Sequence, residues 1–132
     1  MTTRVLSAAV SRKNWVQWFD PRGRNVGSWA FIFNRLTGLA LAAYLPVHFL
    51  IITSLYRGDE AWNGLMAFFR SPFALLFDVG LILALLYHGL NGTRIVLLAF
   101  DIGTTHQKAL LYTVLAATAV LLLLAALALF GV

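Results

Sequence analysis

The chain has 132 residues, of which 61% are hydrophobic and only 11% are charged, with a net charge of +5. These proportions leave too few polar side chains to coat a soluble domain, so they predict a membrane protein. The chain has no cysteine, which excludes thiolate-held iron–sulfur clusters and thiol nucleophiles.

Residues 1–28 are predicted to be a cytoplasmic or interfacial N-terminal segment. Its stretch KNWVQWFDPRG sets aromatic side chains beside cations, which suits either an anchor at the membrane interface or contact with a soluble partner. Basic residues precede or begin the first span against only Asp20: they are Arg4, Arg12, Lys13, Arg22, Arg24 and Arg35. The positive-inside rule therefore predicts a cytoplasmic N-terminus, and the net charge is a topology signal and no nucleic-acid footprint.

Residues 29–132 are predicted to form a membrane domain. Apolar stretches at about 29–55, 72–98 and 109–131 are each long enough to cross a ~30 Å hydrocarbon core. The predicted fold is an all-α membrane protein with three transmembrane helices. Such a small bundle has little interior, so inward-facing polar groups require a second protein or a ligand.

The second apolar stretch contains polar groups in YHGLNGTRIVLLAFD. His88 lies sixteen residues after Pro72, ~24 Å along a helix, where an ionisable group is a functional candidate. The alternative is a neutral imidazole hydrogen-bonded to a neighbouring helix. Gly92 leaves a bare surface one turn on, and Arg94 lies ~9 Å further toward the cytoplasm. An imidazole for iron, a bare patch for a macrocycle and a cation for propionates match the needs of a haem.

His88-x-x-x-Gly92-x-Arg94, together with NRLTG (Asn34–Gly38) in the first span, resembles the cytochrome b subunit of succinate dehydrogenase, the membrane anchor of respiratory complex II. The resemblance extends from about Ser28 to Phe130. It implies that His88 is an axial ligand of haem b and that Arg35 lies at a quinone site near an iron–sulfur subunit. It also implies two further partners, a second membrane-anchor subunit and a flavoprotein subunit. For this chain it implies a location in the inner cell membrane.

Three positions depart from the family pattern. Asn34 stands where the family usually has histidine, Phe31 where some members carry a quinone-contacting serine, and Ala99 where an aspartate usually follows the haem histidine. The nearest acid to this last position is Asp101, which is expected to end the helix or meet a partner.

Arg35 and the nearby Thr37 supply a cation and a hydroxyl for a reduced quinone oxygen. The alternative for Arg35 is a topology anchor that extends to the interface. His48 differs from His88 by on the order of 10 Å in depth, so the two imidazoles are not expected to share one iron. His48 is either the ligand of a second haem or a structural hydrogen-bonding group, with Pro46 redirecting it.

The sequence therefore predicts an electron-transfer anchor of a succinate:quinone oxidoreductase, with one haem b or two and quinone as substrate. No residue of this chain is predicted to act on succinate, because the chain has neither a flavin-binding fold nor cluster ligands. The alternative is a haem-free anchor or small transporter-like subunit in which His48, His88 and Arg94 form a polar interhelical network.

Overall fold

A computed structural model describes residues 26–131. Most of the predicted N-terminal segment, residues 1–25, lies outside the described residues, and the first span begins within its last three positions. The helices in chain order are α1 (Val26–Thr53), η2 (Ser54–Arg57), α2 (Asp59–Phe69), α3 (Pro72–Ala99), η3 (Thr104–His106) and α4 (Gln107–Phe130).

Three helical stretches are long and apolar enough to cross a membrane. They are α1 together with η2, α3 alone, and η3 together with α4. The predicted fold class is confirmed, and the span boundaries agree with the predicted ones to within about three residues. Most of the connection between the first two spans forms α2, a helix that was not predicted from the sequence.

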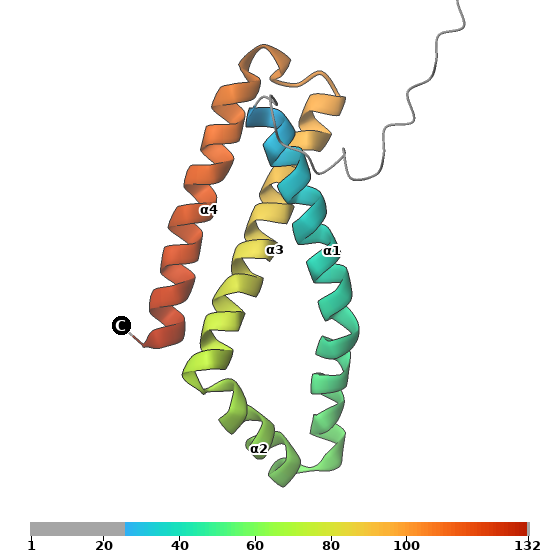
Figure 1. Ribbon diagram of the computed structural model, residues 1–132, viewed down its shortest axis with the longest axis vertical. Helices are drawn as coiled ribbons and strands as arrows, with labels where there is room; N and C mark the ends of the chain where they lie inside the picture. Colours follow the sequence, from blue (N-terminus) through green and yellow to red (C-terminus); the bar gives the residue numbers. More distant parts are fainter. Residues whose placement is uncertain (1–25, 132) are drawn as a thin grey trace, which may run out of the picture.

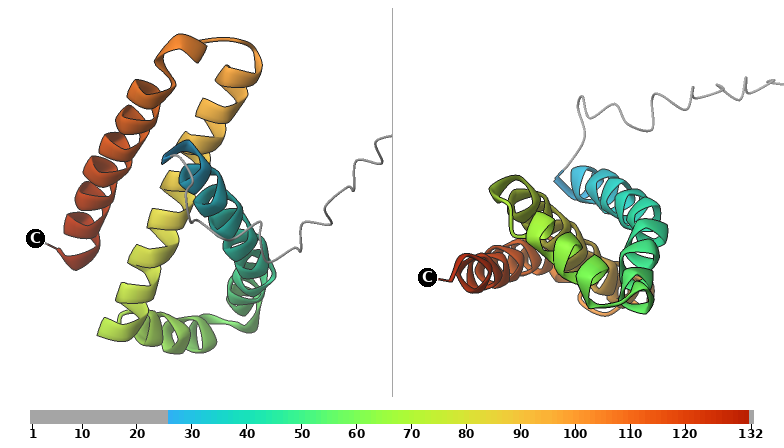
Figure 2. Two further views of the ribbon diagram at one scale, coloured as in Figure 1. Left: turned by 45° about the horizontal axis from the view of Figure 1, so that its top comes forward. Right: turned by 90° about the horizontal axis from the view of Figure 1, so that it is seen from below.

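The helix α3 lies between α1 and α4 and packs against both (Figure 1). We call the end of the bundle with η3 and the start of α1 the η3 end, and the opposite end the α2 end. At the η3 end α1 lies against α3, and toward the α2 end the two diverge until α2 bridges them (Figure 1). Pro46 does not interrupt α1, which changes direction along its length (Figure 2).

Local sequence signals set the ends of α3. Ser71 is its N-cap and accepts a hydrogen bond from Ala74 N (3.4 Å), with Pro72 in the first turn. After the C-cap Phe100, Asp101 adopts a left-handed conformation with φ 63°, which aspartate tolerates better than most residues. Asp101 thus ends the helix, which was one of the two roles expected for it.

The described chain buries few side chains. The buried apolar residues are Ala30, Ile32, Ala74, Tyr87 and Leu111, whereas large side chains such as Leu39, Leu50 and Phe73 are mostly exposed. This pattern suits a chain whose outer surface contacts lipid or other protein chains.

Candidate functional site

His88 lies on α3 and faces α1. Its Nδ1 is 3.0 Å from the backbone oxygen of Asn34 and 3.5 Å from Thr37 Oγ1. A carbonyl oxygen only accepts hydrogen bonds, so Nδ1 carries the proton and donates to Asn34. The lone pair of the imidazole is then on Nε2, the tautomer that protein metal sites select in this way.

A glycine of α1 makes room for this ring. A Cβ added at Gly38 would lie 2.6 Å from His88 Cε1 and 3.1 Å from Nδ1, so any other residue would displace the imidazole. Within residues 26–131 no group hydrogen-bonds to His88 Nε2, and the buried unpaired side-chain nitrogen or oxygen there is Arg94 Nε, so Nε2 is unpaired without being buried. His88 Nε2 is therefore accessible to a ligand.

A polar network continues from His88 toward the η3 end. The Tyr87 hydroxyl donates to Ala30 O (2.9 Å), and Asn91 Nδ2 donates to Asn34 Oδ1 (3.2 Å) and contacts Ala30 O at 3.4 Å. Asn91 has no exposed surface. The side-chain amide of Asn91 therefore links α3 to two residues of α1 by hydrogen bonds from its NH2 group. It is the central residue of the polar contacts between these helices at the η3 end.

Arg94 extends the network to α4. Its Nη1 donates to Asn91 Oδ1 and its Nη2 to Gln107 O, both at 3.4 Å, and the residue is 8% exposed. Six helical residues separate Arg94 from His88, so the two side chains leave α3 about 120° apart. The structure therefore does not bring Arg94 and His88 to one face. At Gly92 a Cβ would meet nothing within 4 Å, so the surface there is open.

Arg35 and Thr37 point in different directions. Thr37 Oγ1 lies 2.8 Å from Phe33 O and 3.1 Å from Asn34 O, on the side of α1 that faces His88. Arg35 is exposed and its Cζ lies 4.3 Å from the centre of the Phe31 ring, a cation–π contact. The cation and the hydroxyl predicted for one quinone site are thus on separate faces.

His48 occupies the other half of α1, toward the α2 end. It lies ten residues beyond Gly38, the neighbour of His88, so the two imidazoles differ by about 15 Å along the helix, more than the sequence alone suggested. His48 is exposed, and its Nδ1 lies 3.4 Å from the Tyr44 hydroxyl. This separation agrees with the expectation that one iron is not shared between them.

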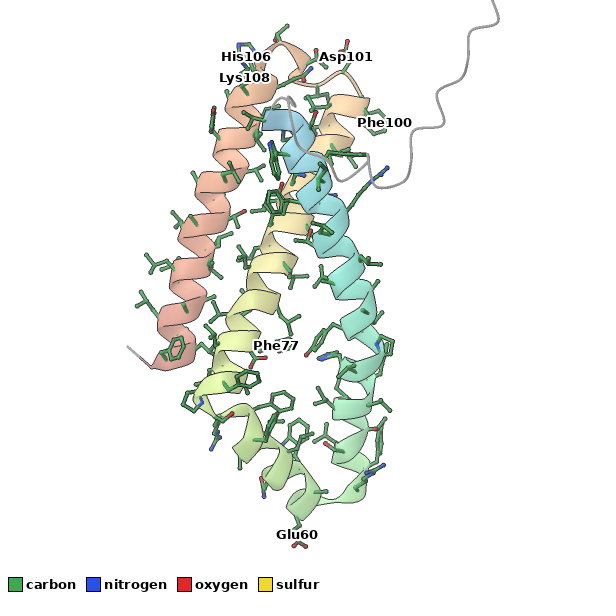
Figure 3. The ribbon with its side chains drawn as sticks, viewed as in Figure 1. Glu60, Phe77, Phe100, Asp101, His106 and Lys108 are labelled. Atoms are coloured by element: carbon green, nitrogen blue, oxygen red, sulfur yellow. The ribbon has the colours of Figure 1, made fainter. Side chains whose placement is uncertain are left out.

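A cavity of about 640 Å³ separates α1 from α3 in this half, with His48 on one wall and Asp78 on the other. Its remaining lining is largely apolar. Phe77 lies on the side of α3 that faces α1, with its ring centre 6.5 Å from that of Tyr44 (Figure 3). Asp78 is a carboxylate inside a span that the sequence reasoning did not consider. Its sequence signal was simple, since it is the one acid in the apolar run of residues 72–86.

The comparisons with known proteins agree with one another. The model of the succinate dehydrogenase/fumarate reductase transmembrane subunit family matches residues 17–128. The chain is 30% identical over 89 residues to the succinate dehydrogenase 2 membrane subunit SdhC of Mycobacterium tuberculosis, covering 67% of this chain and 65% of that protein, just under two thirds of its length. It is 29% identical over 98 residues to the succinate dehydrogenase hydrophobic membrane anchor subunit of Halobacterium salinarum, covering 74% and 75%.

Proposed function

The chain belongs to the succinate dehydrogenase/fumarate reductase transmembrane subunit family and is a multi-pass membrane protein, and from that premise we propose that it is a cytochrome b anchor that passes electrons from an iron–sulfur subunit to quinone. Succinate is oxidised on other chains of the complex. The observation that carries this proposal is the imidazole of His88, which has its Nδ1 directed at a backbone carbonyl and its Nε2 accessible.

His88 is the residue that would hold haem b. The Asn34 carbonyl and the glycine at position 38 fix its tautomer and its orientation before any metal binds, and a backbone acceptor of this kind makes the ring a better donor to iron. A bound haem supplies one-electron transfer at this point. The chain's own contribution is to hold the imidazole in place and to exclude water with the apolar faces of α1 and α3.

In this proposal a second membrane-anchor subunit would supply a further ligand to the haem. Among the described residues the other histidines are His48, about 15 Å away along α1, and His106, in η3. Neither lies at the level of His88. His48 remains the candidate ligand of a second haem, with the haem-to-flavin ratio as its test.

Quinone is proposed to bind near Arg35, at the η3 end, which faces the cytoplasm and the iron–sulfur subunit. A guanidinium stabilises the negative charge that develops on a quinone oxygen during reduction. Arg35 is exposed and contacts the Phe31 ring on the outer side of α1, whereas the hydroxyl of Thr37 lies beside His88. Thr37 is therefore proposed to support the imidazole and not the quinone.

A reduced-minus-oxidised optical spectrum of the purified complex tests the function. A b-type haem band is expected in stoichiometric amount relative to flavin. Its absence from an intact, active complex would contradict the cytochrome role and leave only the anchor role.

The second candidate is a haem-free anchor, and the polar network favours it directly. His88, Asn91 and Arg94 each have a partner in α1 or α4 without any ligand. His48 does not join this network, so it differs from the one expected from the sequence. The same spectrum separates the two candidates, because the haem-free anchor has no b-type band.

Arg35→Leu tests the quinone site. Quinone reduction is expected to fall at least about tenfold, a loss of roughly 1.4 kcal/mol in transition-state stabilisation, while succinate oxidation by an artificial acceptor and haem content stay near normal. Equal loss of both activities would indicate an assembly defect, in which case Arg35→Lys, which keeps the charge, separates charge from assembly. Unchanged quinone reduction would remove Arg35 from the site.

A further inference from the structure

A second cavity lies at the η3 end, between the first turns of α1 and α4 and the end of α3. Its volume is about 580 Å³. Two cations, Arg94 and Lys108, line it together with the polar residues Ser28 and Gln107. This cavity is on a different side of α3 from His88, so it is separate from the proposed haem ligand.

Arg94 is the main observation, because none of the described residues around it carries a charge that compensates its buried guanidinium. It is 8% exposed, its two hydrogen bonds are both 3.4 Å long, and its Nε has no partner. Both acceptors are neutral oxygens. A guanidinium carries five N–H donors and a full charge, and burying it next to neutral groups alone is costly. Among residues 26–131, no acidic side chain lines this cavity.

Further positive potential converges on the same place. Lys108 adds a second full charge, and α1 and α4 both begin here, so the positive ends of both helix dipoles point toward the cavity. Figure 3 shows Lys108 on the first turn of α4 and Asp101 in the connection after α3. Asp101 is an acid of this end of the described chain, but it does not line the cavity.

We propose that this cavity binds the phosphate group of an anionic phospholipid, with Arg94 and Lys108 as its two cationic ligands. A phosphodiester supplies the oxyanion that these groups lack. The remaining wall contains apolar residues, among them Val26, Leu111 and Tyr112, which suit the glycerol and upper acyl chain of a lipid better than a free, fully hydrated phosphate. The ends of three membrane-crossing helices are also where lipid headgroups are found.

This site stands independently of the proposed haem and quinone chemistry. The alternative occupant is a haem propionate, because its carboxylate is an oxyanion, as the phosphate of a lipid is. The positions of the residues favour the lipid, because Arg94 and His88 leave α3 about 120° apart.

The test measures phospholipid retained by the assembled complex after extensive detergent washing, by native mass spectrometry. The wild type is expected to keep an anionic phospholipid that Arg94→Gln and Lys108→Ala lose, and Lys108→Arg is expected to keep it. Affinity for added phosphatidylglycerol should fall at least about tenfold in Arg94→Gln. Arg70→Gln, which removes one positive charge at the α2 end, is the matched control and should keep the lipid.

Three results would overturn the proposal. The first is retention of the lipid by both Arg94→Gln and Lys108→Ala. The second is that phosphatidylcholine, or inorganic phosphate alone, stabilises the wild type against heat as much as phosphatidylglycerol does. The third is a changed haem spectrum in Arg94→Gln with lipid content unaltered, which would identify a propionate as the occupant. If Arg94→Gln fails to assemble, Lys108→Ala decides, because Lys108 is exposed and its loss does not disturb packing.

Discussion

The two halves of the α1–α3 pair are held in different ways. At the η3 end, His88 and Asn91 hydrogen-bond to α1 and the helices are in contact (Figure 1). Toward the α2 end, His48 and Asp78 face a cavity of about 640 Å³ from opposite walls. Polar groups inside a membrane join helices where each finds a partner, and where they do not, the helices stay apart and leave room for a ligand or another chain.

The largest effect is expected from breaking the centre of the η3-end network. Asn91→Leu removes the bonds to Asn34 and Ala30 and takes one of two acceptors from the buried Arg94. We expect a loss of about 2 kcal/mol in the free energy of unfolding, measured on the assembled complex in detergent. Tyr44→Phe is the control from the other half, because it removes only a 3.4 Å bond to the exposed His48 and should cost less than about 0.5 kcal/mol. Equal losses would show that the two halves do not differ.

A smaller effect is expected from adding one methyl group at the imidazole. In Gly38→Ala the new Cβ would lie 2.6 Å from His88 Cε1, so the ring must move away from the Asn34 carbonyl. We expect a cost of about 1 kcal/mol and a lower haem content.

Gly80→Ala in the other half of α3 is the matched control for this change. A Cβ there meets nothing within 4 Å, so stability and haem content should stay as in the wild type. A normal haem spectrum in Gly38→Ala would contradict the placement of His88 against this glycine.

The smallest effect is expected at His48, which lies in the half of the α1–α3 pair where a cavity separates the two helices. His48→Ala should leave the spectrum of the haem proposed to bind at His88 unchanged, because the two residues are about 15 Å apart along the helix. The haem-to-flavin ratio then assigns the residue. A ratio that falls from two to one identifies His48 as a ligand of a second haem, and a wild-type ratio of one excludes that role.

The spans were predictable because hydropathy and length alone define a membrane-crossing helix, and the three spans match to within about three residues. Helix α2 was not predicted, since its residues lie between the first two apolar stretches and no secondary structure was assigned to them. Asn91 was visible as a polar residue but received no role. Its spacing from Tyr87 and Arg94, four and three residues, places all three on one face of α3 and could have identified the network.

The relation of His88 to its neighbours was only partly predictable. The sequence treated Arg94 as part of the same haem site, although six residues on a helix leave two side chains about 120° apart, which periodicity alone could have shown. In contrast, the contact between Gly38 and His88 and the facing positions of His48 and Asp78 depend on how α1 is aligned with α3. The periodicity of a single sequence does not reveal that alignment, because it is set by juxtapositions of residues thirty to fifty positions apart.

The most direct test of the proposed function is the reduced-minus-oxidised and low-spin haem spectrum of the assembled complex carrying His88→Ala, with His106→Ala as the matched histidine control. The proposal predicts that the haem is lost or becomes high-spin in His88→Ala and is unaltered in His106→Ala, since His88 would be the residue of this chain that holds the iron. An unchanged low-spin spectrum in a stably assembled His88→Ala complex would contradict it and assign the ligand to another residue.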